Sequence, residues 1–141
     1  MEINTKSEQQ PISRDKIIHF PEGILGFESL KDYNILSSET EKDLHWLRSV
    51  DDENIEFAIT DPTIFQVDYE IALNDVEAGL LEASEDSEIL VLIILYKNDH
   101  ESESSGIKGN FTAPVLINAD TNKGMQKILN NTRGSMTIKS S

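Results

Sequence analysis

The chain contains no cysteine among its 141 residues. This absence excludes disulfide bonds, metal sites built on thiolates and a cysteine nucleophile. Long hydrophobic runs are absent as well: the longest, ILVLIILY at residues 89–96, is too short to cross a membrane as a helix. The first ten residues, MEINTKSEQQ, carry no apolar stretch of the kind found in a secretory signal. We therefore expect a cytoplasmic protein with no membrane segment.

Basic residues are scarce, because 12 Lys and Arg stand against 26 Asp and Glu, for a formal net charge of −14. Such a charge opposes binding to DNA or RNA and favours basic partners. Residues 49–96 hold 13 acids and no Lys or Arg, whereas residues 107–141 hold one acid and five bases. We therefore predict an acidic face that steers a basic protein partner; the plainer alternative is that the acidity only aids solubility.

Motifs of enzymes and metal sites are absent or incomplete. Three histidines lie on separate segments without metal-ligand spacing, at His19, His45 and His100. The segment NADTNKG at 118–124 resembles a calcium loop, but its glycine falls one place late and Leu129 stands where a ligand Glu is required. Paired carboxylates such as Glu85 and Asp86 lie in polar, turn-like contexts, whereas catalytic pairs need burial. We predict no metal, no cofactor and no enzymatic activity, with a small acidic-pocket enzyme as an alternative.

Short strand patterns separated by turn residues recur along the chain. We expect strands over residues 16–20, 33–38, 44–50, 55–60, 69–73, 88–97, 107–118, 125–129 and 136–139. Residues 88–97 are rich in β-branched side chains without alternation, which indicates a central strand buried on both faces. A short helix is expected over 74–84 with Asn74 as its N-cap, and one helical turn over 28–32. The fold class is therefore all-β and mainly antiparallel, a small barrel-like or sandwich domain with one or two short helices.

The stretch HFPEGILGFESL, residues 19–30, combines glycines and a proline with bulky apolar residues. Gly23 and Gly26 permit tight backbone angles, so we interpret the stretch as a structural corner whose apolar side chains enter the core. An exposed apolar contact is the alternative. Trp46 is also expected in the core. We expect one domain over residues 15–138, after a flexible arm of residues 1–14.

Several motifs occur together in order: FPEGILGFE, WLRSVDDENIEFAITDP, DYEIAL, ILVLIILY and NFTAPVLINADTNKGMQKIL. This combination resembles the family of the flagellar assembly factor FliW over about residues 16 to 130. The resemblance implies a small, mainly antiparallel barrel-like domain and a non-enzymatic cytoplasmic regulator. Members of the family bind flagellin before its export, and bind the RNA-binding regulator CsrA and stop it repressing translation, with flagellin and CsrA competing.

The resemblance therefore implies flagellin and CsrA as partners, no direct contact with nucleic acid or membrane, and a monomer when free. A flagellin-binding chaperone without the regulatory partner is the alternative. Candidate residues for electrostatic contact are Asp51, Asp52, Glu53, Asp68 and Glu70. Candidate anchors for an apolar partner segment are Ile64, Phe65 and Tyr69, although this loop could instead fold back on the core. Other positions that match the family pattern are interpreted as fold-makers: Pro21, Gly23, Gly26, Asp61, Pro62, Pro114 and Asn118.

Overall fold

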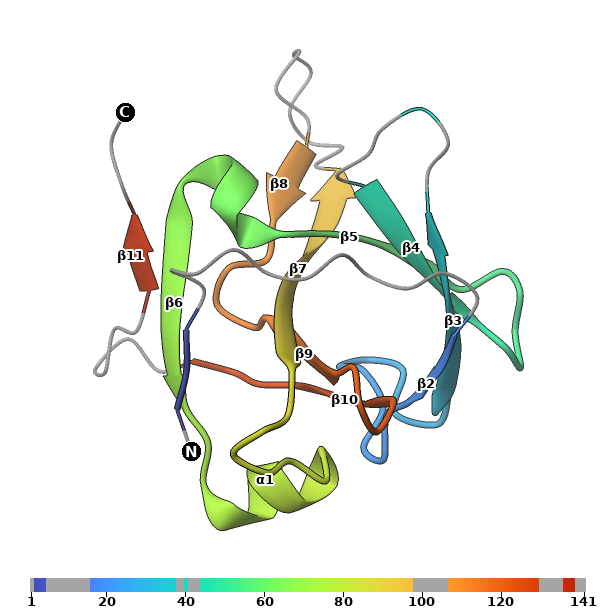
Figure 1. The fold of residues 1–141 in the computed structure, drawn as a ribbon. Coiled ribbons are helices and arrows are strands. Elements are labelled where there is room, and N and C mark those ends of the chain that lie inside the picture. The colour runs from blue at the N-terminus through green and yellow to red at the C-terminus, as the bar shows by residue number, and fades with distance from the viewer. Residues whose placement is uncertain are drawn as a thin grey trace.

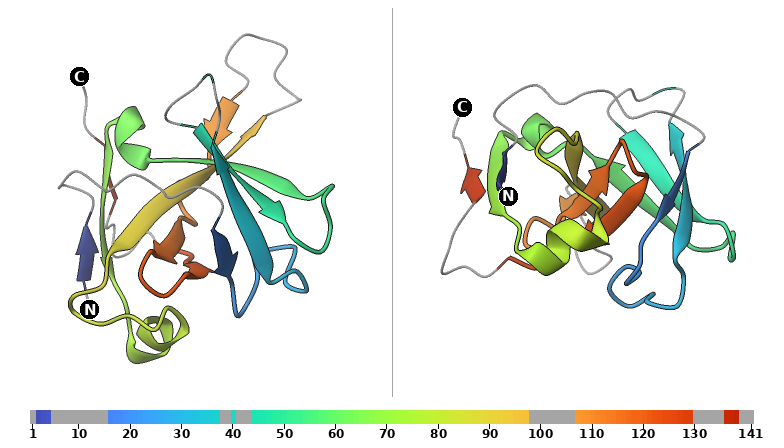
Figure 2. Two further views of the ribbon diagram at one scale, coloured as in Figure 1. Left: turned by 45° about the vertical axis from the view of Figure 1, so that its right-hand side comes forward. Right: turned by 60° about the horizontal axis from the view of Figure 1, so that its bottom comes forward.

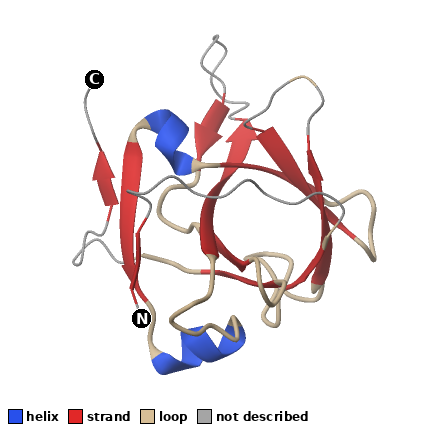
Figure 3. Ribbon diagram, in the orientation of Figure 1, coloured by secondary structure: helices blue, strands red, loops and turns tan. Residues whose placement is uncertain are grey.

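The computed structural model describes six stretches of the chain: residues 2–4, 16–37, 40, 44–97, 107–129 and 136–138. Within them lie eleven strands, one α-helix and one 3-10 helix (Figure 3). The strands are β1 (Glu2–Asn4), β2 (Ile17–His19), β3 (Asp32–Ser37), β4 (Leu44–Ser49), β5 (Glu56–Thr60), β6 (Val67–Ala72), β7 (Ile89–Lys97), β8 (Ile107–Gly109), β9 (Val115–Asn118), β10 (Lys123–Gln126) and β11 (Met136–Ile138). The 3-10 helix is η1 (Pro62–Phe65) and the α-helix is α1 (Asp75–Leu80).

Seven strands form a closed barrel in the order β5-β4-β3-β2-β10-β9-β7, which the pairing of β5 with β7 completes (Figure 1). All neighbours in this barrel are antiparallel except β2 and β10, which pair in parallel where His19 faces Lys123. Strand β8 extends the sheet beside β7. The predicted class, all-β and mainly antiparallel with a barrel-like core, is confirmed.

A second layer covers part of the barrel wall. Strand β6 lies between β1 and β11 in an antiparallel three-stranded sheet, drawn beside the barrel in the right panel of Figure 2. Ile3 of β1 is buried in a cluster with Tyr69 of β6 and Ile93 of β7. The expectation of a loose arm therefore fails for residues 2–4, because the Ile3 side chain is buried in this layer. The rest of that arm, residues 5–14, lies outside the described residues.

Strand β7 is buried on both faces over residues 90–93, as its composition predicts, whereas Tyr96 near its end is 51% exposed. Leu90 and Leu92 point into the barrel interior, whereas Val91 and Ile93 belong to the second cluster, between the barrel wall and β6. Successive side chains of a strand point to opposite faces. The missing alternation in ILVLIILY thus follows from two separate hydrophobic cores, one on each side of the same strand.

The stretch 19–30 is a structural corner between β2 and β3. Gly23 has a φ of 71°, and a Cβ atom there would lie 2.6 Å from the backbone Cα of Glu28, so both the angle and the close approach require glycine. Ile24 is buried, but Leu25 is 50% exposed. The helix expected over 28–32 is not formed: the Leu30 N–H donates to the Phe27 carbonyl and closes a tight turn, and β3 begins at Asp32, directly after the Lys31 carbonyl accepts from the Phe20 N–H.

The helix expected after Asn74 is present as α1. Asn74 accepts a hydrogen bond from the Glu77 N–H, and the Glu77 carboxylate accepts one from the Asn74 N–H, which completes a capping box.

Other boundaries differ from the prediction. The single strand expected over 107–118 is split into β8 and β9, since residues 111–114 turn the chain before β9. Trp46 is only partly buried, on the face of β4 opposite Leu47 and the barrel core.

Candidate partner-binding surfaces

The acidic turn, which we define as Asp51, Asp52 and Glu53, joins β4 to β5. The hydroxyl of the buried Ser49 accepts hydrogen bonds from the backbone N–H groups of Asp51 and Asp52, at 3.2 and 3.0 Å. The Asp52 carboxylate accepts one from the Asn54 N–H at 3.1 Å. Asp51 and Glu53 are exposed and Asp52 is partly exposed. The turn therefore presents three carboxylates on a backbone that is already ordered.

The helix η1 occupies the other end of β5. Asp61 caps it, because its carboxylate accepts hydrogen bonds from the backbone N–H of Thr63 at 2.9 Å and from the Thr63 hydroxyl at 2.7 Å. Gln66 closes the turn in the left-handed region, with its N–H donating to the carbonyls of Pro62 and Thr63. The expectation that Asp61 caps the turn through its side chain is confirmed. The sequence pattern did not, however, predict the helical conformation of η1.

Ile64 and Phe65 extend outward from η1 and are 47% and 41% exposed. The Phe65 ring packs edge-on against Phe111, with ring centroids 5.7 Å apart and an interplanar angle of 89°. We call Ile64, Phe65 and Phe111 the η1 surface. Phe111 was not a candidate from the sequence, since it lies far from Phe65 in the chain and no local pattern connects the two. Ile64 and Phe65 are thus available to a partner, as the prediction requires.

Tyr69 corrects the set of anchors. It is fully buried in the second hydrophobic cluster, and its hydroxyl donates to the Phe111 carbonyl at 2.7 Å. Its ring therefore supports the η1 surface from beneath and is not accessible to a partner. Alternation along β6 explains the difference: Val67, Tyr69 and Ile71 face the core, while Glu70 is exposed. Asp68 lies on β6 as well, but its side chain is outside the described residues.

The candidate residues therefore form two groups rather than one site. The acidic turn precedes β5 and the η1 surface follows it, so the five-residue strand separates them (Figure 1). At about 3.3 Å per residue this distance is roughly 17 Å. Figure 1 draws the acidic turn at the right of the barrel and η1 at the upper left.

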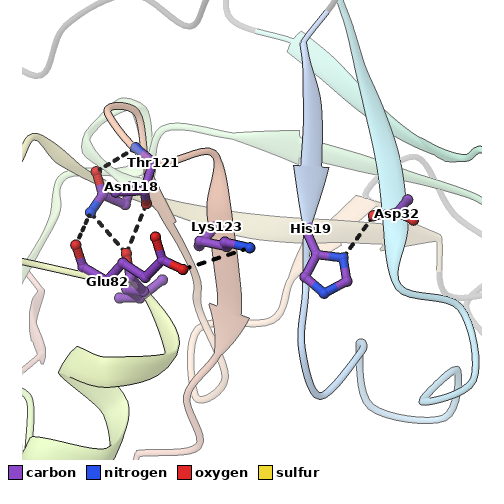
Figure 4. Close-up of polar contacts among 7 residues, drawn as sticks. His19, Asp32, Glu82, Asn118, Thr121 and Lys123 are labelled. Atoms are coloured by element: carbon purple, nitrogen blue, oxygen red, sulfur yellow. Dashed lines mark hydrogen bonds and ion pairs between the residues drawn. The ribbon is translucent and has the colours of Figure 1, made fainter.

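The acidic and basic parts of the sequence are not fully separated in space. Lys127, near the end of β10, lies 2.6 Å from the Glu77 carboxylate of α1, and Lys123 lies 3.8 Å from that of Glu82. Figure 4 shows Lys123 pointing toward Glu82 and His19 paired with Asp32. The acids around α1 are thus partly neutralised by β10. No Lys or Arg side chain is paired with the acidic turn among the interactions described.

Asn118 has a structural role, as the sequence indicates. Its side-chain oxygen accepts from the N–H groups of Asp120 and Thr121, and its amide donates to the Leu81 carbonyl at 2.9 Å (Figure 4). It therefore holds the β9–β10 turn against the end of α1. Within the described residues, no group of three or more His, Cys, Asp or Glu side chains could hold a metal ion. In the same residues, no helix has the length and apolarity needed to cross a membrane.

Comparison with known proteins agrees with the fold and with the order of motifs. The family model described as FliW protein matches residues 2–140. The chain belongs to the FliW family. It is 34% identical over 128 residues to flagellar assembly factor FliW 1 of Desulfotalea psychrophila, covering 90% of this chain and 89% of that one. It is 37% identical over 122 residues to flagellar assembly factor FliW of Azoarcus sp., with 84% of each chain covered.

A solved structure supports the same assignment. The crystal structure of the flagellar assembly factor FliW matches with a TM-score of 0.70 and 25% identity, over 93% of this chain and 88% of that one. The resemblance predicted from the ordered motifs is therefore confirmed. Family membership makes the protein a flagellar assembly factor, which directs attention to the two exposed surfaces rather than to a catalytic pocket.

Proposed function

We propose that this protein is a non-enzymatic cytoplasmic factor that binds flagellin before export and, when free of flagellin, binds and antagonises CsrA. The acidic turn is the observation that carries the proposal. Asp51, Asp52 and Glu53 stand on an ordered turn in a chain of net charge −14. A protein that binds RNA phosphates is basic, so these carboxylates would steer it and hold it at close range.

Antagonism then follows from charge. Carboxylates held beside an RNA-binding groove repel the phosphates of the RNA, even where they do not occupy the groove. Asp68 and Glu70 of β6 are proposed as further electrostatic contacts, whereas Ile64 and Phe65 are proposed as apolar anchors for a segment of flagellin. Salt screens such interactions over about 10 Å at 0.1 M, so inhibition of CsrA should weaken as ionic strength rises.

Partner exchange would couple export to translation. While flagellin is retained in the cell, it occupies the factor and CsrA stays free to repress. When flagellin is exported, the freed factor binds CsrA and repression of flagellin translation is relieved. The factor itself needs no catalytic group for this cycle, because both steps are binding equilibria.

An acidic-pocket enzyme receives little support from the burial pattern. A catalytic carboxylate pair needs burial to separate the two pKa values. Where burial is described, the polar residues of the core are Ser49, Thr60 and Asn118, and none is a carboxylate. The exposed carboxylates of this chain are therefore better suited to binding a basic partner than to acid–base catalysis.

A calorimetric titration of the protein with its cognate CsrA, repeated with flagellin present, tests the proposal. We expect a heat of binding with CsrA that flagellin abolishes or strongly reduces. Binding to flagellin alone would reduce the function to that of a flagellin chaperone. The absence of heat with both proteins would contradict the proposed function.

A further inference from the structure

The contact between β2 and β10, which we call the β2–β10 seam, is the least paired contact of the barrel. Only one residue pair, His19 with Lys123, joins the described parts of the two strands (Figure 4), whereas three to five residue pairs join every other pair of neighbours in the barrel. The His19 N–H donates to the Asn122 carbonyl at 2.9 Å. Because few backbone hydrogen bonds must break, local opening at this seam costs less free energy than at the other contacts.

Two polar contacts reinforce the seam near its ends. The Lys16 ammonium donates to the Ala119 carbonyl at 3.3 Å, and the Leu25 N–H donates to the side-chain oxygen of Gln126 at 3.0 Å. The first contact is partly buried and the second is exposed, so water can replace both when the strands separate. These contacts therefore add little to the free energy that opening costs.

Phe20 closes the seam from inside the barrel. Its side chain is fully buried in the barrel core, and a Cβ atom on Gly124 of β10 would lie only 2.7 Å from its ring. The same ring lies edge-on against Tyr33 of β3, with ring centroids 5.4 Å apart. Since Phe20 contacts both β10 and Tyr33, a movement of Phe20 away from β10 would let water reach the Tyr33 side chain.

Two buried polar atoms beside β2 lack a hydrogen-bond partner among the residues that the structure describes. They are the Tyr33 hydroxyl and the side-chain oxygen of Asn122. Tyr33 pairs with Ile18 of β2, and the Asn122 backbone carbonyl accepts the hydrogen bond from His19. An unpaired buried polar group destabilises the closed barrel, and water that reaches the group removes this cost. Hydration of the two atoms therefore offsets part of the free energy needed to separate β2 from β10.

We propose that the β2–β10 seam opens locally in the folded protein, with movement of Phe20 away from Gly124, while the other barrel contacts stay paired. In the open state β2 keeps its three residue pairs with β3. Opening admits water to the barrel core without unfolding the barrel. The motion is a property of the barrel itself and is independent of the proposed function.

Hydrogen exchange of the full chain tests the proposal, because the His19 amide N–H bridges the seam. After correction for intrinsic rates, we expect this amide to exchange at least about 10-fold faster than the amides that pair β4 with β5, and with little dependence on dilute denaturant. The chain has no cysteine, so His19→Cys combined with Lys123→Cys can form only one disulfide within a molecule. Residues 16–20 should exchange at least about 10-fold more slowly in its oxidised form than in its reduced form.

Two single substitutions should change the opening in opposite directions. Gly124→Ala places a methyl group against the Phe20 ring and should speed exchange of residues 16–20, whereas Tyr33→Phe removes an oxygen that only the open state hydrates and should slow it, each by about 3-fold. Gly109→Ala is the matched control, because a Cβ atom there would also be crowded, at 2.8 Å from the nearest side chain, but on β8.

Exchange of the His19 amide only through global unfolding, at the rate of the amides between β4 and β5, would overturn the proposal. Equal exchange of residues 16–20 in the oxidised and reduced forms of the cysteine variant would overturn it as well. If the cysteine variant does not fold, the two alanine variants decide. Faster exchange of residues 16–20 in Gly124→Ala than in Gly109→Ala supports local opening, and equal exchange in both contradicts it.

Discussion

The loops at the two ends of β5 are both ordered by a side chain that accepts backbone hydrogen bonds, but one loop exposes charged side chains and the other apolar ones. At one end Ser49 accepts hydrogen bonds from the backbone of the acidic turn, and at the other Asp61 accepts them from the backbone of η1. The first support presents carboxylates, and the second presents Ile64 and Phe65. The comparison shows that the hydrogen bonds that order the backbone of a surface loop do not determine which side chains the loop exposes. Two rigid supports on one strand can serve two partners of different character.

Removing the support at each end gives the largest expected effect. Ser49→Ala leaves two backbone N–H groups without their acceptor next to a buried site, so we expect the free energy of unfolding to fall by about 2 kcal/mol. Asp61→Ala removes a helix cap and should cost about 1 kcal/mol. Chemical denaturation of both variants measures the difference. Equal losses of unfolding free energy in the two variants would mean that the burial of Ser49 does not increase its contribution to stability.

Neutralising the acidic turn should separate the two ends in function. Asp51→Asn, Asp52→Asn and Glu53→Gln together remove three charges, and we expect CsrA affinity at low salt to fall about 10-fold, mostly through slower association. Flagellin affinity at the η1 surface should change little. The matched control is Asp75→Asn, Glu85→Gln and Asp86→Asn, which removes the same charge from exposed residues elsewhere. If the control triple weakens CsrA binding equally, net charge and not the turn is responsible.

Two buried tyrosines distinguish the cores beneath the two ends. The Tyr69 hydroxyl donates a hydrogen bond to the Phe111 carbonyl beneath η1, whereas the Tyr33 hydroxyl in the barrel core has no hydrogen-bond partner among the residues that the structure describes. Burial raises the pKa of Tyr33 to about 12 and also raises the pKa of Tyr69. Tyr69→Phe should therefore destabilise the fold by about 1 kcal/mol, and Tyr33→Phe should be neutral or slightly stabilising. Equal destabilisation by both substitutions, in thermal unfolding at pH 7, would show that the Tyr33 hydroxyl is bonded in solution.

The smallest effect is expected from an ion pair that lies at neither end of β5. Burial raises the pKa of Glu77, but the hydrogen bond from Lys127, the hydrogen bond from the Asn74 backbone N–H and the Lys127 charge together hold this pKa below its ordinary value. A lowered pKa stabilises the fold above the unfolded value, and the contribution is lost as pH falls through the folded one.

Glu77→Gln keeps the capping oxygen and should cost about 0.5–1 kcal/mol at pH 7. Denaturation curves at a series of pH values should show this cost vanishing below the ordinary Glu pKa. The control Glu85→Gln, at an exposed position, should lower the free energy of unfolding very little at any pH. A cost that persists unchanged in acid would assign the effect to packing instead of charge.

The fold could be predicted well where local pattern and tertiary structure agree. The apolar run of β7 and the Asn74 cap of α1 carry their signals within a few residues, and both were found. The position of the corner at Gly23 could be predicted, but its conformation could not, because a tight turn closed by the Leu30 N–H and the start of β3 at Asp32 replace the helix expected over 28–32. Strand β1 was not predicted, because its pairing with β6 and the burial of Ile3 are tertiary contacts that the local sequence does not show.

The candidate surfaces were predictable in part for a related reason. Charge is visible in a sequence, so the acidic turn could be identified from Asp51–Glu53 alone. Tyr69 could not be told from Phe65 by composition, and only the alternation of β6 buries one while η1 exposes the other. Phe111 joins the surface through tertiary packing that leaves no mark in the neighbouring sequence.

The central claim is that this FliW-family protein antagonises an RNA-binding regulator by charge. The most direct measurement is the fluorescence anisotropy of a labelled RNA bound to CsrA as the protein is added, at low and at high salt. We predict release of the RNA at low salt and a clear loss of inhibition at high salt. RNA that stays bound throughout the titration, or inhibition that is indifferent to salt, would contradict the claim.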